Sequence, residues 1–329
     1  MRVEFAGLLD LQVNGFGGID FNAKDLTAER LSEALDAMRA TGVTRCLPTL
    51  ITSSFDDFAH SARVIAGVSS PAIAGIHMEG PYLSPEDGAR GAHPRRHLTA
   101  ATVEDFERRQ TAAGGLIRLV TLAPEVPGAL TLIEHLAATG VRVALGHTAA
   151  APAQIADAIS AGATLATHVG NGCAQMLPRH PNVIWEMLAA DALVASLIVD
   201  GHHLPPATVK AMVRAKGKAR TILISDAIAA AGCRPGRYMI GGVMCDLGED
   251  GRVSLPGTPY LAGSSLRLND AIANTVRFTG CSLHDVASMA STIPAAYLGT
   301  TTLGRVVAEW DAANASLRIL DVRLDESSH

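Results

Sequence analysis

Eight short apolar runs, separated by segments with helix-like boundaries, constrain the fold of this chain most strongly. They span residues 8–15, 42–51, 73–80, 116–125, 141–148, 164–171, 196–203 and 221–227. Such a run predicts a parallel strand buried on both faces, because helices cover both sides of a parallel sheet. Helices are predicted between the runs, at residues 25–42, 54–67, 99–115, 127–140, 151–162, 181–191 and 205–217. The alternation predicts an α/β fold, a closed (β/α)8 TIM barrel.

A doubly wound open sheet is the alternative. That fold usually carries a glycine-rich phosphate loop that leads from the first strand directly into a helix. Here the glycines of residues 14–20 continue into Phe21 and Asn22, so we favour the barrel.

We expect the barrel to occupy residues 1–304, with a hairpin within 233–257 and closing helices at 261–280 and 282–299. Asp250 and Gly251 are the turn signal of that hairpin. Residues 305–329 are predicted to form a C-terminal tail with one or two strands outside the barrel.

Composition narrows the possible partners and the compartment. The 329 residues are 48% hydrophobic and 18% charged, which allows a large core and argues against disorder. The net charge is −5 without a basic cluster, so nucleic acid is not an expected partner. Five scattered cysteines without a C-x-x-C pair favour the reducing cytoplasm. No secretory signal or membrane-spanning stretch is recognised, and a soluble protein is expected.

Glu79, His147 and His168 each end a different apolar run. In a barrel these strand ends meet on one face, which is where barrel enzymes place their chemistry. Two imidazoles and one carboxylate form a catalytic zinc set that leaves a coordination position for water. A single histidine is more often a hydrogen-bonded core residue, but three ligands at three strand ends favour a metal. We predict one divalent ion, zinc first, with iron, cobalt and manganese as alternatives.

Asp226 and His203 are the predicted catalytic partners of the metal. Asp226 ends the last run and is suited to taking a proton from water and delivering it to a leaving group; a helix N-cap is the alternative. His203, which follows Asp200, could donate to a substrate hydroxyl or polarise a carbonyl. His202 competes for that role, and one of the two histidines is expected to be structural.

Two loop segments after the sixth run could meet the substrate. Asn171 offers a side-chain amide and adjacent backbone donors. Arg179 and His180 form a cationic loop suited to an anionic substrate, with an ordinary solvated loop as the alternative.

Two absences favour a single metal. The first run, DLQVNG, has no His-x-His pair for a second ion, and the fourth, LIRLVTLAPE, has no lysine that could become a bridging ligand.

In these motifs the chain resembles the N-acetylglucosamine-6-phosphate deacetylase family of the amidohydrolase superfamily. The matching segments are LLDLQVNGFGGIDFN, LPTLITS, GIHMEGPYLS, GARGAHP, TLAPE, GHT, ATHVGN, VDGHH, SDA and LAGSS, in order. The resemblance implies a cytoplasmic homodimer that hydrolyses the acetamide of an N-acetylated amino-sugar phosphate. It assigns the metal to Glu79, His147 and His168, and proton transfer to Asp226. The implied substrate contacts are Ala92, Asn171, Gly172, Arg179, His203, Leu261, Ala262 and Gly263. Gln12 stands where binuclear members keep a histidine, as a vestigial second-metal position.

The chain departs from the family pattern in two places. Members usually begin with a segment that builds most of a small β-sandwich, whereas here the barrel is expected to begin almost at Met1, leaving the tail as a remnant without its usual strand partners. The family's Asn-Ala-Met triplet reads Asn171-Gly172-Cys173 in a loop that helps to hold phosphate. Three alternatives therefore accompany the main prediction: N-acetylgalactosamine 6-phosphate, an unphosphorylated N-acyl sugar, or a non-catalytic sugar-binding barrel.

Overall fold

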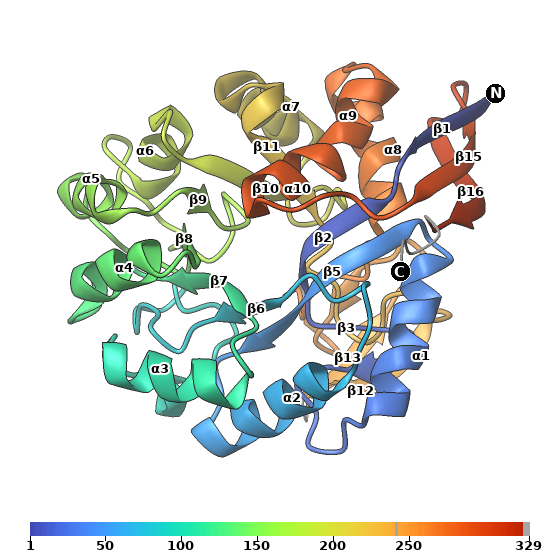
Figure 1. The fold of residues 1–329 in the computed structure, drawn as a ribbon. Coiled ribbons are helices and arrows are strands. Elements are labelled where there is room, and N and C mark those ends of the chain that lie inside the picture. The colour runs from blue at the N-terminus through green and yellow to red at the C-terminus, as the bar shows by residue number, and fades with distance from the viewer. Residues whose placement is uncertain (241–242, 259, 325–329) are drawn as a thin grey trace.

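Eight parallel strands form one sheet that curls until its first and last strands meet (Figure 1). This computed structural model describes residues 1–240, 243–258 and 260–324. In order of pairing the strands are β2 (Leu8–Val13), β5 (Val43–Ile51), β6 (Ile76–Glu79), β7 (Ile117–Leu122), β8 (Arg142–Leu145), β9 (Leu165–Ala166), β10 (Val194–Ile198) and β11 (Thr221–Ile224). Val13 bridges Ala227 in parallel, and the amide of Asp226 donates to the carbonyl of Gln12 at 2.9 Å. The predicted TIM barrel is confirmed.

Helices surround the strands. They are α1 (Ala28–Arg39), α2 (Phe55–Gly67), α3 (Val103–Ala112), α4 (Ala129–Ala138), α5 (Pro152–Ala161), α6 (Val183–Ala189), α7 (Pro206–Lys216), α8 (Leu268–Thr279), α9 (Leu283–Met289) and α10 (Thr292–Leu298), with short 3-10 turns η1 (Arg95–His97) and η2 (Lys218–Arg220). Thr27, Ser54 and Thr102 accept hydrogen bonds from the first turns of α1, α2 and α3. The boundary chemistry expected from the sequence therefore sets these helix starts.

Every residue of β2, β6 and β11 is buried, as a strand covered on both faces requires. One of the buried residues of β2 is Asp10. Its Oδ1 accepts hydrogen bonds from the amides of Gln12 and Ser225, both at 3.2 Å. These bonds join β2 to the residue after β11. Burial raises the pKa of Asp10 to about 7.

Two of the expected helices differ from the structure. The predicted helix 261–280 begins only at Leu268, because Ser264 pairs with Ala227 and holds the chain extended. The predicted helix 282–299 is interrupted between α9 and α10, where the carbonyl of Ala290 accepts from the amide of Leu9 at 2.9 Å. In both places a long-range contact with the barrel outweighs local helix preference.

A second, smaller sheet lies beside the barrel. It joins β1 (Arg2–Ala6) to β15 (Arg305–Asp311), which in turn pairs with β16 (Ser316–Arg323), all antiparallel. The expectation that the tail lacks strand partners is thus corrected, because β1, which precedes the first barrel strand, pairs with β15. The tail strands have a partner because β1 covers one edge of β15. The division into 1–304 and 305–329 stays a prediction.

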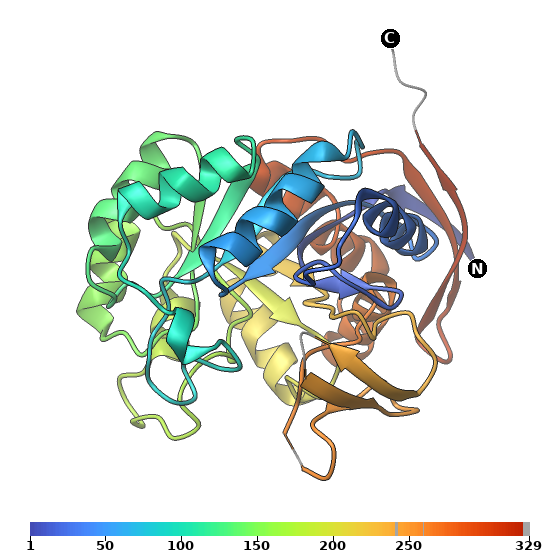
Figure 2. The ribbon, with the colours of Figure 1, turned by 90° about the horizontal axis from the view of Figure 1, so that it is seen from below.

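A third sheet follows the last barrel strand. It contains β12 (Gly236–Ile240), β13 (Val243–Leu247) and β14 (Val253–Ser254), and Figure 2 shows it projecting beyond the barrel in orange. A short hairpin of β3 (Gly15–Phe16) and β4 (Ile19–Asp20) follows β2. The predicted turn at Asp250-Gly251 is present, with Gly251 at φ 80°. Among the described residues no helix is long and apolar enough to cross a membrane.

Candidate metal and catalytic site

Three side chains from three strand ends converge on one point, as the sequence predicts. Oε1 of Glu79, at the end of β6, lies 3.0 Å from Nε2 of His168 and 3.2 Å from Nε2 of His147. The two Nε2 atoms are 3.1 Å apart. All three side chains are buried, and they form a cluster able to hold a metal ion.

The cluster fits a divalent cation in two respects. In a tetrahedral site with bonds of about 2.0–2.1 Å, neighbouring donor atoms are separated by about 3.3 Å, close to the distances found here. Nδ1 of His147 lies 3.0 Å from the carbonyl oxygen of Ala89, which can only accept. The proton of this ring is therefore on Nδ1, and Nε2 presents the lone pair that a metal ligand needs.

Electrostatics within the cluster favour an anionic carboxylate facing the imidazoles. Burial raises the pKa of Glu79, but the close imidazoles of His147 and His168 outweigh it and hold that pKa well below its ordinary value. Burial opposes the charged form of His168, yet the bond to Glu79 leaves its pKa raised. The ionised carboxylate of Glu79 therefore favours a positive charge at the centre of the cluster.

The backbone turns sharply where the site residues leave their strands. His147, His168 and Asp226 have φ angles of 50°, 31° and 46°, in the left-handed region that residues with a Cβ rarely adopt. Such strain costs about 1–3 kcal/mol per residue and concentrates at functional sites. Gly91 and Gly172 pack against the ring of His147, where a Cβ on either would come within 3.0 Å of a ring atom. The glycines leave room for that ring.

Asp226 stands beside the cluster and is bridged to it by an amide. Nε2 of Gln12 donates to Oε1 of Glu79 at 2.9 Å and to Oδ1 of Asp226 at 3.1 Å. Nδ2 of Asn14 donates to the same Oδ1 at 2.8 Å. Burial, followed by the neighbouring Glu79 carboxylate, raises the pKa of Asp226 to about 6. Residues 227–235 form a bridge and turns, so the helix-cap alternative is not observed.

The two adjacent histidines after β10 take different partners. Nδ1 of His203 lies 2.6 Å from Oδ2 of Asp200. His202 points to the third sheet, where Nε2 is 3.1 Å from the carbonyl oxygen of Asp250. His202 is therefore the one with a structural contact.

The remaining predicted substrate residues lie outside the barrel strands. The segment Leu261, Ala262 and Gly263 leads into Ser264, which pairs with Ala227, the residue after Asp226. Asn171 and Gly172 are half-buried next to His168 and His147.

Ala92 and Arg179 are exposed. Within the described part of the chain Arg179 makes no ion pair, and the structure does not join it to the cluster.

His93 was missed by the sequence interpretation. Its Nε2 lies 3.2 Å from Nε2 of His147, and its Nδ1 lies 2.9 Å from Oγ1 of Thr52. Burial and the neighbouring His147 lower the pKa of His93 to about 3, so the ring is neutral. Nε2 of His147 carries a lone pair and no proton. A hydrogen bond between the two rings therefore requires the proton to be on Nε2 of His93. His93 belongs to the GAHP motif, which does not follow an apolar run. The position of His93 is therefore not predicted from the ends of the strands.

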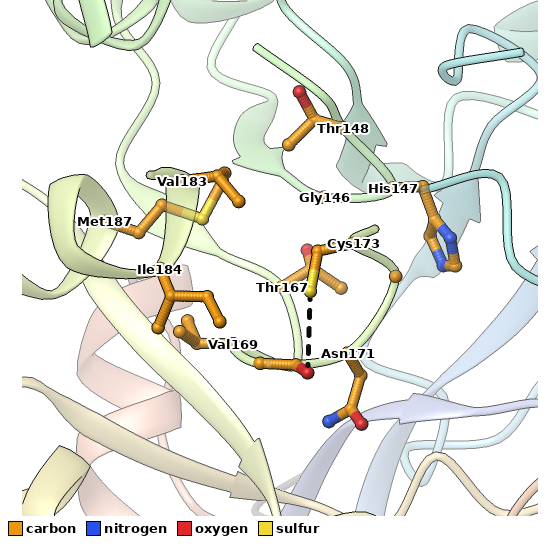
Figure 3. A pocket seen from close by; sticks show the side chains of 12 residues that line it. Gly146, His147, Thr148, Thr167, Val169, Asn171, Cys173, Val183, Ile184 and Met187 are labelled. Carbon is orange, nitrogen blue, oxygen red and sulfur yellow. Dashed lines mark hydrogen bonds between the residues drawn. The ribbon is translucent and has the colours of Figure 1, made fainter. Parts of the chain in front are cut away.

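A small pocket lies behind His147, between the loop of residues 170–173 and α6 (Figure 3). Cys173 points into it, with Sγ 3.7 Å from the carbonyl oxygen of Gly170, and Val183 and Met187 line the opposite side. Its free volume of about 10 Å³ is that of a single water, so a sugar cannot enter.

A TIM barrel with this ligand cluster and an aspartate at its strand ends defines a metal-dependent hydrolase. Residues 4–317 match the model of the amidohydrolase family. The N-acetylglucosamine-6-phosphate deacetylase of Bacillus subtilis is 35% identical over 89% of this chain and 74% of its own length. The chain therefore belongs to the amidohydrolase family, within its N-acetylglucosamine-6-phosphate deacetylase branch.

Other relatives support the same placement. The N-acetylgalactosamine-6-phosphate deacetylase of Escherichia coli O157:H7 is 33% identical over 88% of this chain and 77% of its own. The solved N-acetyl-D-glucosamine-6-phosphate deacetylase of Mycobacterium smegmatis is 30% identical with a TM-score of 0.88, covering 98% of this chain and 86% of that one. The family implies a divalent metal, and the Glu79 cluster could bind it.

Proposed function

We propose that this enzyme hydrolyses the acetamide of N-acetylglucosamine 6-phosphate, releasing glucosamine 6-phosphate and acetate. The observation that carries the proposal is the donor cluster of Glu79, His147 and His168 with Asp226 beside it, linked through Gln12. The names of the relatives supply the substrate, and a Mycobacterium smegmatis relative has been solved in complex with N-acetyl-D-glucosamine-6-phosphate.

Glu79, His147 and His168 would hold one divalent ion, for which we propose zinc. When bound, such an ion supplies Lewis acidity, which polarises a carbonyl and lowers the pKa of water. Gln12 keeps Glu79 in place without adding charge, because its amide donates to the carboxylate. A neutral amide at this position fits a single-metal site.

Asp226 takes the proton of the attacking water and passes it to the amine that leaves. Hydrogen bonds from Gln12 and Asn14 fix its Oδ1, so Oδ2 is the atom left to move the proton. A pKa above the usual range for aspartate makes this carboxylate a better base than a solvated one. His93 presents Nε2–H beside the ligand cluster, where it can donate to the acetamide oxygen.

The substrate contacts remain proposals. Asn171, Gly172, His203, Ala92 and the segment 261–263 would surround the sugar. In a homodimer, Arg179 would contact the phosphate of a substrate bound to the neighbouring subunit, which accords with its exposed position. A cytoplasmic location accords with the scattered free cysteines.

Acetate release tests the proposal. Purified protein is loaded with zinc, its metal content is measured, and acetate is followed during incubation with N-acetylglucosamine 6-phosphate. We expect turnover that a chelator abolishes and zinc restores. No acetate from protein that carries one ion per chain would refute the substrate assignment.

N-Acetylgalactosamine 6-phosphate is the second candidate, favoured by the similarity to the Escherichia coli O157:H7 and Shewanella deacetylases of that sugar. Parallel assays with both phosphorylated sugars and with free N-acetylglucosamine rank the candidates by kcat/KM. Binding of the sugars without acetate release would favour the non-catalytic barrel.

A further inference from the structure

The turn after β10 is built around one carboxylate. Oδ1 of Asp200 accepts from the amides of His202 and His203, both at 2.8 Å. Oδ2 of the same side chain lies 2.6 Å from Nδ1 of His203. Gly201, at φ 85°, lets the backbone fold around the carboxylate. Both oxygens of Asp200 are thus used within its own turn.

The pair formed by Asp200 and His203 is shielded from solvent. Their side chains are only 10% and 12% exposed. Burial alone would raise the pKa of Asp200, but the bonds from His203 and His202 outweigh it and leave that pKa lowered. Asp200 is therefore ionised, and an ionised carboxylate can only accept. The short contact must carry its proton on Nδ1 of His203.

The strand end that carries this pair is itself anchored. Nδ2 of Asn274, on α8, donates to the carbonyl of Val199 at 2.8 Å. His202 is turned away, towards Asp250. His203 lies near enough to Asp226 that a positive charge on its ring would lower the pKa of that carboxyl group. His203 is thus the histidine of this turn that belongs to the site.

We infer that Asp200 is a positioning residue: it fixes the proton of His203 on Nδ1, so that Nε2 faces the substrate as an acceptor for a sugar hydroxyl. With a single proton on Nδ1, the ring has no proton on Nε2 to donate and cannot polarise a carbonyl. From the sequence, His203 is expected either to donate to a substrate hydroxyl or to polarise a carbonyl. The contact with a hydroxyl remains, but His203 accepts the hydrogen bond instead of donating it. The part of the inference that concerns the substrate rests on the proposed function.

The position of the proton can be measured without turnover. Long-range ¹H–¹⁵N spectra of ¹⁵N-labelled, metal-loaded protein at pH 8 distinguish a ring nitrogen that bears a proton from one that does not. The His203 signals are assigned by their loss in His203→Asn. We expect a protonated Nδ1 and an unprotonated Nε2 in the wild type. A proton on Nε2 there, in a neutral or a charged ring, would overturn the inference.

Asp200→Asn tests the cause. Two backbone amides hold the side-chain oxygen at the Oδ1 position, so the new amide nitrogen faces Nδ1 of His203 and donates to it. The proton of His203 should then move to Nε2 in the spectrum. Asp191→Asn, which alters an exposed ion pair with Arg220, is the control and should leave the His203 signals unchanged.

Kinetics show whether Asp200 acts through His203. We expect Asp200→Asn to lower kcat/KM by about 10–100-fold, by analogy with the loss of a group that orients a metal-ligating histidine. The double variant with His203→Asn should lose no more than His203→Asn alone. A double variant that loses the product of the two single effects would contradict action through His203. If no amino-sugar substrate is turned over, the proposed function fails while the spectra still decide the tautomer.

Discussion

The Nε2 atoms of His93 and His147 lie 3.2 Å apart, with the rings edge to face and their centroids separated by 4.3 Å. His147 gives its own proton to the carbonyl of Ala89. His93 therefore supplies the proton between the rings, and it can turn this donor to an oxygen once Nε2 of His147 is bound to a metal.

Replacing His93 with phenylalanine keeps the ring shape and removes the donor. We expect kcat to fall by about 10²–10³-fold, as for the loss of one oxyanion-stabilising donor. Metal content should stay at one ion per chain, because His93 is outside the ligand cluster. Rates of acetate release and metal analysis check both points; loss of the ion together with activity would make His93 a ligand.

Asp226→Asn should abolish proton transfer and leave the ligand cluster intact. General acid–base catalysis contributes about 10²–10⁴-fold, so a fall of that size in kcat is expected. The matched control is Asp246→Asn, which breaks an exposed ion pair with Arg237 and should retain full activity. An Asp226→Asn enzyme that retains wild-type kcat would remove Asp226 from the mechanism.

Gln12→Met removes the amide that bridges Glu79 and Asp226 while keeping a side chain of similar length. Without the donor the two carboxylates face each other unscreened, and a buried acceptor loses its partner at a cost of about 1–3 kcal/mol. The metal-free variant should unfold at a lower temperature than the metal-free wild type. Bound zinc should narrow the gap because it also neutralises Glu79. Equal unfolding temperatures without metal would show that the bridge does not stabilise the fold.

Gly172→Ala tests how closely the loop approaches the metal ligand. The added Cβ would lie 2.8 Å from Nδ1 of His147, so the ring or the loop must move. We expect weaker zinc binding in a competition assay with a chelator. Gly299→Ala is matched to it, since Gly299 has a similar φ of 67° with nothing within 4 Å of the new Cβ. It should lose some stability through backbone strain and no zinc affinity; equal affinities in both variants would exclude the contact.

Asp10→Asn tests the buried carboxyl that joins β2 to the end of β11. Its pKa in the folded protein, about 7, is above that of an unfolded aspartate, so folding favours the protonated form. The stability this gives is fully present below about pH 4 and is lost as the pH rises through 7, with each pH unit in between removing about 1.4 kcal/mol. The variant should unfold at a higher temperature than the wild type at pH 8, with the advantage shrinking towards pH 5. An advantage that does not change with pH would assign the effect to packing.

The sequence predicts the barrel and the ligand cluster because both follow one pattern. Glu79, His147 and His168 each end an apolar run, and parallel strands bring such ends to one face. His93 follows no strand, and only the fold carries its loop back over His147. The start of α8 is similarly hidden, since the extended stretch before it depends on Ser264 pairing with Ala227. The roles given to the loop residues stay predictions.

The pairing of β1 with β15 has a consequence for how the chain acquires its structure. Met1 and Trp310 are hydrogen-bonded across 309 positions of sequence. During synthesis the first strand waits until almost the whole chain has left the ribosome, and pairing at such long separation is slow. We therefore expect the pairing of β1 with β15 to be a late step of folding, and a ribosome that stalls before residue 305 would leave β1 without its partner.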